Sequence, residues 1–154
     1  MEEPSLPLTG RAESGTAVAR IGKATYHTEI ALPEGHSLTA DLPAFAGGQN
    51  DGPAAIDLLL ASFAAGKAAL IRMQADRHGW PMTGAVISAR HHRENARSLG
   101  EGRRGIVDVI DCEIEILGDE LTDQQRRRLA EMSNHCWVQH ALRHETLINT
   151  RLVT

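Results

Sequence analysis

The sequence has few aromatic residues and no long apolar run. Aromatic residues make up 3% of the 154 residues, so the core must be built mainly from Leu, Ile, Val and Ala. No apolar stretch approaches the roughly 20 residues that a membrane-spanning helix needs, so we expect no membrane partner. The first residues are acidic and contain no apolar signal-peptide segment. We therefore expect a cytoplasmic protein.

Dense positive charge is also absent. The formal net charge is −4, and the strongest basic run is Arg126–Arg128. Acidic residues flank that run, namely Asp119, Glu120, Asp123 and Glu131. Charge runs of mixed sign usually form the solvated face of a helix, so we expect these arginines to point outward. We expect no nucleic-acid partner.

Cysteine is scarce, with Cys112 and Cys136 as the two thiols of the chain. A structural disulfide between them is not expected in a reducing cytosol. The length and the 42% apolar content favour a single globular domain over residues 16–154. Residues 1–15 are polar and irregular, and we expect them to form a mobile tail.

The N-terminal third predicts short antiparallel strands. Loose alternation over residues 16–32, interrupted at Gly22, indicates two strands or one long bulged strand. Residues 33–36 carry a turn signal, and residues 37–41 are typical of a strand that returns to complete a hairpin. The glycine-rich loop over residues 47–52 lacks the GxxxxGK(S/T) spacing of a phosphate-binding loop. We interpret it as a long turn and expect no cofactor.

The stretch from Gly52 to Trp80 predicts a long central helix. Pro53 suits a first helical turn, and Gly79 followed by Pro81 ends the helix. Up to Ala69 the helix is apolar almost all round, which is typical of burial in a core. Gly66 is anomalous because a glycine inside a helix costs about 1 kcal/mol relative to alanine. Either another group approaches closely there or a side chain has been lost.

The second half predicts two strands around a polar loop. Residues 83–90 are typical of a strand, and residues 91–104 are polar enough to predict a loop or hairpin tip with an exposed His91-His92 pair. From Ile106 the apolar residues alternate over a half-buried antiparallel strand, with Cys112 on the apolar face. A packed core thiol is therefore the expected role of Cys112.

A second helix and a last strand close the chain. Thr122 is the expected N-cap of a helix whose apolar side includes Leu129, Met132 and Val138. Cys136 is expected where this helix ends or bends. Residues 146–153 predict a short final strand. Helices packed on antiparallel sheet give an α+β fold.

Three separate segments stand out: GPAAIDLLLA at residues 52–61, RHGWP at residues 77–81 and CWVQHAL at residues 136–142. In this order they resemble the OsmC/Ohr family of thiol-dependent hydroperoxide reductases. The terminal INTRLV resembles the last strand of the family. The resemblance covers about residues 16–153.

The resemblance implies an OsmC-like homodimer with swapped strands, whose sites combine residues of both subunits. In the family, a first cysteine on the long helix attacks an organic hydroperoxide. A second cysteine resolves the sulfenic acid as a disulfide, which small thiols or lipoyl groups then reduce. We therefore expect self-association, with an organic hydroperoxide or an apolar ligand and a thiol reductant as small-molecule partners.

The sequence departs from the family at the attacking residue. Gly66 occupies the position of the first cysteine, and no residue from Ala61 to Ile71 supplies a thiol. Glycine cannot form a sulfenic acid, so the two-cysteine cycle is not expected to run. Cys136 matches the second cysteine, and helix amides with His135 or His140 could stabilise its thiolate. The alternative is an inert, partly buried thiol.

Asp57 resembles the acidic residue that family members use to hold an arginine near the thiol, and Arg20 is the candidate partner. The alternative for Asp57 is an ordinary acidic residue in a first helical turn. Cys136, His140 and His144 have the i, i+4, i+8 spacing of zinc ligands on one continuous helix. The segment is short, and we expect no metal.

Two functional interpretations remain open. The chain is either a peroxidase with Cys136 as its single catalytic thiol, assisted by Asp57 and Arg20, or a non-catalytic binding protein. In the second case a small apolar ligand occupies the former active-site pocket at Gly66, Phe63 and His140.

Overall fold

The computed structural model describes residues 14–102 and 104–152. The chain divides into two compact units, one up to Leu58 and one from Leu59, with the boundary inside helix α1 (Ala55–His78). The prediction of a single domain over residues 16–154 stays a prediction. In the described residues, no helix has the length and apolar character needed to cross a membrane.

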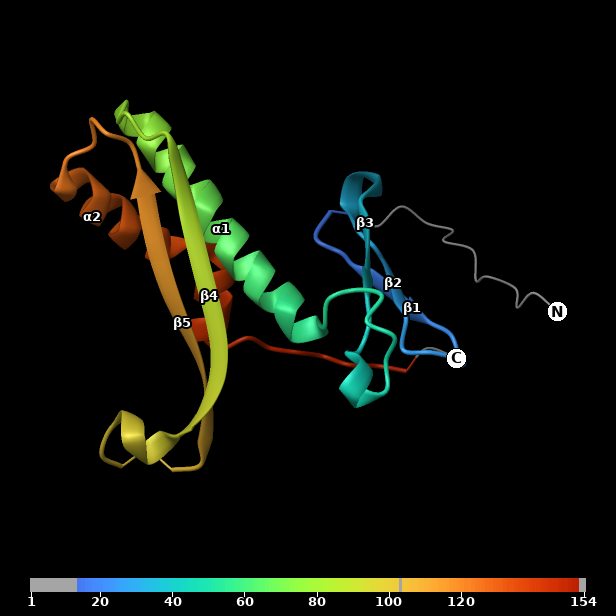
Figure 1. Ribbon diagram of the computed structural model, residues 1–154. Helices are drawn as coiled ribbons and strands as arrows, with labels where there is room; N and C mark the ends of the chain where they lie inside the picture. Colours follow the sequence, from blue (N-terminus) through green and yellow to red (C-terminus); the bar gives the residue numbers. More distant parts are fainter. Residues whose placement is uncertain (1–13, 103, 153–154) are drawn as a thin grey trace. The chain divides into compact units, whose positions relative to one another are not determined.

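The N-terminal unit contains a three-stranded antiparallel sheet in the order β1-β2-β3 (Figure 1). Its elements are β1 (Val18–Ile21), β2 (Thr28–Ala31), η1 (Pro33–Gly35), β3 (Ser37–Ala40) and η2 (Ala44–Ala46). The predicted interruption at Gly22 and the turn before β3 are both confirmed. Ile30 lies opposite Ala19 on one side and Leu38 on the other. Little covers this sheet within the unit, because the apolar side chains of Val18 and Ile21 in β1 and of Tyr26 just before β2 are exposed.

A buried carboxylate organises the loop that follows β3. Asp41 accepts hydrogen bonds from the backbone N–H of Leu42 (2.7 Å), Gln49 (3.0 Å) and Asp51 (3.1 Å). The bond from the Asp51 amide is the main reason why the pKa of Asp41 lies below its ordinary value. Gly52 closes the loop where a Cβ atom would lie 2.5 Å from the Thr39 carbonyl oxygen, so the family-like Gly-Pro motif needs glycine here.

Helix α1 is buried along one stripe. Phe63, Lys67, Ile71 and Ala75 follow each other at four-residue spacing and are buried. The expectation of burial all round is wrong for the single chain, since the opposite stripe of Ala61, Ala65, Ala69 and Met73 is exposed. The helix ends as predicted at Gly79, which adopts a left-handed φ of 63°.

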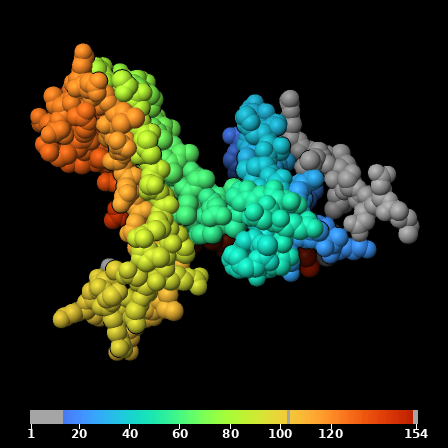
Figure 2. Space-filling view, viewed as in Figure 1, coloured from blue at the N-terminus to red at the C-terminus, as the bar shows by residue number. Residues whose placement is uncertain are grey.

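The C-terminal unit is built on a long two-stranded hairpin of β4 (Gly84–Asn95) and β5 (Ile106–Leu117). The predicted loop or hairpin tip over residues 91–104 is wrong in its first part, because β4 continues to Asn95. From η3 (Ala96–Leu99) onward the residues do form a hairpin tip. His91 and His92 therefore lie in a strand, opposite Ile110 and Val109, and are half-buried rather than exposed. The hairpin tip projects away from helix α1 (Figure 2).

Cross-strand charge pairs explain why this polar stretch forms a strand. Arg90 Nη2 lies 2.9 Å from an Asp111 carboxylate oxygen, and Asp108 receives bonds from both His91 (2.8 Å) and Arg93 (3.0 Å). Opposite charges facing each other across a sheet stabilise pairing that hydrophobic alternation does not reveal.

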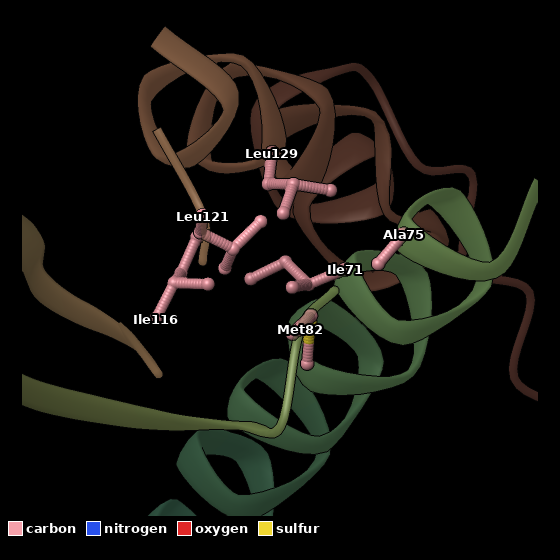
Figure 3. Packing of buried hydrophobic residues seen from close by; sticks show 6 residues of the cluster. All are labelled: Ile71, Ala75, Met82, Ile116, Leu121 and Leu129. Carbon is pink, nitrogen blue, oxygen red and sulfur yellow. The ribbon is translucent and has the colours of Figure 1, made fainter. Parts of the chain in front are cut away.

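The core of this unit lies where α1, the start of β4, the end of β5 and α2 (Asp123–Met132) meet (Figure 3). Its buried residues are Ile71, Ala75, Met82, Ile116, Leu121 and Leu129. No aromatic side chain is among them, and Trp80 packs at the edge. The expectation of an aliphatic core is confirmed for this cluster.

Helix α2 begins as predicted at Thr122. The Thr122 hydroxyl accepts from the Gln125 amide (3.1 Å), and the Gln125 side chain accepts from the Thr122 amide (2.9 Å). The prediction that Arg126 points outward is wrong. Its guanidinium donates to the carbonyl oxygens of Leu121 (2.6 Å), Gly118 (2.6 Å) and Ile116 (3.2 Å), at the end of β5 and in the connection to α2. Backbone carbonyls in such a connection are not paired by the hydrogen bonds of a helix or sheet, so they need other donors, and the Arg126 side chain supplies them.

The chain bends after α2, at the place expected for Cys136. A short η4 (Ser133–His135) follows α2, and α3 (Trp137–Arg143) begins directly after Cys136, so Val138 lies on α3 and not on α2. The predicted final strand over residues 146–153 is absent from the described residues, which reach 152. A strand needs a neighbour to pair with, and none of the strands in the described residues pairs with this segment.

Candidate functional site

Gly66 and Cys136 face each other inside the C-terminal unit. A Cβ atom built on Gly66 would lie 3.9 Å from both Cβ and Sγ of Cys136, and 3.6 Å from Val138 Cγ2. These are ordinary van der Waals distances, so glycine is not required here by crowding. Close approach of another group therefore does not explain the glycine, and the loss of a side chain at this position stays a prediction. Gly66, which resembles the family's first cysteine position, lies against Cys136, which resembles the second.

Cys136 is a buried thiol at a helix start. It is 4% exposed, and its Sγ accepts a hydrogen bond from the Gln139 amide at 3.4 Å as the N-cap of α3. Both cysteines of the chain are free. Trp137 next to it is 86% exposed. Whether Cys136 reacts with peroxides stays a prediction.

A pocket of about 350 Å³ lies in the same unit, against the stripe of α1 that carries Phe63 and Lys67. The residues that line it come from α1, β5, η4 and α3: Phe63, Lys67, Asp108, Ile110, Cys112, Asn134, Gln139, Leu142 and Arg143. Of the three residues predicted to bind a ligand, Phe63 lines this pocket, whereas Gly66 and His140 are not among its lining residues. The volume is at the lower end of the range for small-molecule sites.

Lys67 is a buried charged residue among those that line the pocket. It is 2% exposed, and its Nζ donates to the Ser133 carbonyl (3.4 Å), the Ser133 hydroxyl (3.3 Å) and Asn134 Oδ1 (3.1 Å). The ammonium also lies 5.2 Å from the centre of the Phe63 ring. Sequence reasoning missed Lys67, although one signal was available. Between Ile56 and Ile71 the helix carries only two charged residues, Asp57 in the first turn and Lys67 in the apolar stretch.

The other ionisable groups of the pocket are Asp108, Arg143 and Cys112. The hydrogen bonds from His91 and Arg93 hold the pKa of Asp108 below its ordinary value, so Asp108 is ionised and already paired. Burial raises the pKa of Cys112, and the nearby charge of Lys67 only partly opposes that effect. Cys112 is half-buried on the apolar face of β5 and is protonated at neutral pH.

Arg20 and Asp57 belong to the N-terminal unit. Asp57 accepts a hydrogen bond from the Ala54 amide at 3.1 Å, which is the helix-start role considered as the alternative for this residue. In the described residues no ion pair joins Arg20 to Asp57, and Arg20 Nη1 is buried without a hydrogen-bond partner. Their position relative to Cys136 stays a prediction.

His140 lies on α3 beside a second, open hollow of about 580 Å³ that it shares with Trp137 and His144. The rings of His140 and His144 stack with their centres 4.1 Å apart. His144 Nδ1 lies 3.0 Å from the His140 carbonyl oxygen. Across residues 14–102 and 104–152, no three side chains of His, Cys, Asp or Glu gather closely enough to hold a metal ion.

Comparison with solved structures identifies proteins of similar fold. An organic hydroperoxide resistance protein, OsmC, from Legionella pneumophila shares 18% identity and a TM-score of 0.61, covering 85% of this chain and 91% of its own. The organic hydroperoxide resistance protein OhrB of Bacillus subtilis shares 19% identity and a TM-score of 0.54, covering 83% and 89%. An OsmC-like protein of unknown function from Vibrio cholerae shares 10% identity and a TM-score of 0.62, covering 82% and 91%.

These similarities establish the fold, which is the α+β architecture expected from the sequence. A search of curated proteins found no sequence match. A comparison with protein-family models matches residues 48–151 to the family described as OsmC-like protein. The matched range includes α1, the β4–β5 hairpin, α2 and α3. The chain therefore belongs to the OsmC-like protein family.

Proposed function

We propose that this protein is a small-molecule-binding member of the OsmC-like family that has lost the two-cysteine hydroperoxide cycle. The observation that carries the proposal is the pairing of Gly66 with Cys136, with 3.9 Å between the Cβ that Gly66 lacks and the Cys136 sulfur. The resolving position is retained, and the attacking thiol is missing.

The chemistry of the cycle explains why this loss matters. An attacking thiolate breaks the O–O bond of a hydroperoxide, keeps one oxygen as a sulfenic acid and releases the alcohol. A second thiol then displaces water to form a disulfide. Gly66 has no sulfur for the first step. Cys136 is 4% exposed and does not line the neighbouring pocket, which disfavours it as a replacement nucleophile.

The pocket supports the binding role. Phe63, Ile110 and Leu142 give it an apolar wall. A concave site with an apolar wall and few polar groups is the usual form of a small-molecule site. The proposed ligand enters this pocket without being turned over.

Cumene hydroperoxide consumption with dithiothreitol or reduced lipoamide tests the loss of the cycle. We expect the wild-type protein not to consume the hydroperoxide and Gly66→Cys to consume it. In Gly66→Cys/Cys136→Ser the resolving thiol is missing, so we expect a lower rate of consumption than in Gly66→Cys. Gly66→Ala is the matched control for filling the space without a thiol. Wild-type turnover that disappears in Cys136→Ser would contradict the proposal and favour a one-cysteine peroxidase with Cys136 as the nucleophile.

We also propose that the chain forms a homodimer. The exposed stripe of α1 is apolar. Leu147, Ile148 and Leu152 are each at least 80% exposed, in a segment that pairs with no strand of the described residues. Large apolar side chains that are exposed in this way are typical of an interface. A partner strand would satisfy both the apolar side chains and the backbone of residues 146–152.

Light scattering coupled to gel filtration tests this arrangement. The wild-type protein is expected at twice the mass of the 16.7 kDa chain, and Ile148→Asp is expected to shift the equilibrium toward monomer. Leu99→Asp, on the exposed hairpin tip, serves as the control for an added charge. A monomeric wild type at micromolar concentration would contradict the proposal.

A further inference from the structure

The most unusual group in the C-terminal unit is the buried ammonium of Lys67. Burying a charge is costly unless an opposite charge or good hydrogen bonds compensate for it. In the described residues no carboxylate forms an ion pair with Lys67, and its three acceptors on Ser133 and Asn134 are neutral. The distances of 3.1 to 3.4 Å lie at the long end of the hydrogen-bond range.

The neutral acceptors hold the ammonium in place without neutralising it. The Ser133 hydroxyl donates to the Ala130 carbonyl at 2.7 Å, so it faces Lys67 as an acceptor. Asn134 Oδ1 is shared with the Gln139 side chain at 3.5 Å, and both of these residues line the pocket. Cys112 does not neutralise the charge either, because burial raises its pKa.

The charges that line the pocket sum to an excess of positive charge. Lys67 and Arg143 contribute two cations, and no described carboxylate forms an ion pair with Arg143. Asp108 is the one carboxylate among the lining residues that the structure describes, and it is already engaged by His91 and Arg93. The site therefore lacks an anion next to Lys67.

The opposite wall defines the rest of the ligand. Phe63, Ile110 and Leu142 are apolar, so a molecule that fills about 350 Å³ must combine an anionic end with an apolar body. We propose that this pocket binds a small amphipathic carboxylate, with Lys67 pairing with the carboxylate, Arg143 assisting at the rim, and Phe63, Ile110 and Leu142 covering the apolar tail. This inference rests on the proposed binding function and names its ligand class.

Calorimetric titration of the full-length protein with sodium octanoate tests the inference, with 1-octanol as the uncharged probe of the same tail. We expect Lys67→Met to weaken octanoate binding by about tenfold or more, since a hydrogen bond to a charged group contributes more than a neutral one. Binding of 1-octanol is expected to stay within about twofold, because methionine keeps the length and apolar character of the side chain. Arg143→Gln is expected to weaken octanoate binding by a smaller factor.

Arg127→Met is the matched control, because it removes one positive charge from an exposed position outside this pocket. Thermal unfolding checks that each variant is folded. If wild type binds both probes and Lys67→Met binds octanoate equally well, the carboxylate assignment is wrong while the binding function stands. If wild type binds neither probe, the proposed binding function itself fails. An equal loss with Arg127→Met would show a nonspecific charge effect and overturn the role of Lys67.

Discussion

Replacing Gly66 with cysteine should recreate a disulfide without moving the backbone. The Cβ atom that the substitution adds would lie 3.9 Å from Cys136 Cβ. Disulfide-linked residues have Cβ atoms about 3.5–4.5 Å apart. The nearest other atom is Val138 Cγ2 at 3.6 Å, an ordinary contact, so the new side chain also fits.

The size of the effect follows from the loop that the bond would close. About 70 residues separate the two positions, and the chain-entropy relation gives about 4 kcal/mol of stabilisation for a loop of that length. This is an upper value, because strain in the folded state reduces it. Replacing a glycine inside a helix raises the free energy of unfolding by a few tenths of a kcal/mol, and it does so equally in the oxidised and the reduced protein. The difference between oxidised and reduced protein therefore isolates the disulfide.

Thiol titration and thermal unfolding measure the outcome. The variant should show three free thiols when reduced and one, Cys112, after mild oxidation with diamide, and its oxidised form should unfold at a higher temperature. Gly66→Ala should show no redox dependence of stability. Gly66→Cys/Cys136→Ser has no thiol at position 136, so the disulfide between positions 66 and 136 should not form in this variant.

Two results would refute the reasoning. If Gly66→Cys kept three titratable thiols in the folded, oxidised sample, α1 and the start of α3 could not lie as described. If peptide mapping found the introduced cysteine bonded to Cys112, the pairing with Cys136 would be wrong. Either result would also remove the observation that supports a lost redox site.

Three further predictions concern the fold. Arg126→Met should lower the free energy of unfolding by roughly 1–3 kcal/mol in urea titrations, because three carbonyl oxygens lose a charged donor, whereas Arg127→Met should change it by less than about 0.5 kcal/mol. Ile71→Ala, at a fully buried position, should cost about 2–5 kcal/mol in the same assay; a smaller loss would show a core that collapses around the gap. The pKa of Asp41 is lowered below 3.8 in the folded protein. The ionised carboxylate therefore stabilises the fold above about pH 3.8, and this stabilisation is lost as the pH falls below that value. The difference in melting temperature between wild type and Asp41→Asn should therefore shrink below about pH 4, while Asp119→Asn, at an exposed acid, should show no such trend.

The sequence by itself determined the elements that depend on local signals. The helix over α1 was predictable from its composition and from the Gly79 and Pro81 stop, and the α2 start from the capping chemistry of Thr122. The anomaly of Gly66 was visible as a helix-breaking residue in a strong helix. These features follow from propensity and capping, which act over a few residues.

Tertiary structure decided what depends on partners far away in sequence. The extension of β4 through His91 and His92 arises from pairing with β5, and the inward role of Arg126 arises from carbonyl oxygens of the β5–α2 connection. Lys67 became a site residue only when packing placed it at a pocket and gave its ammonium neutral hydrogen-bond acceptors on Ser133 and Asn134. A local pattern records which side chains are charged, but only packing determines which charges are left without a counterion.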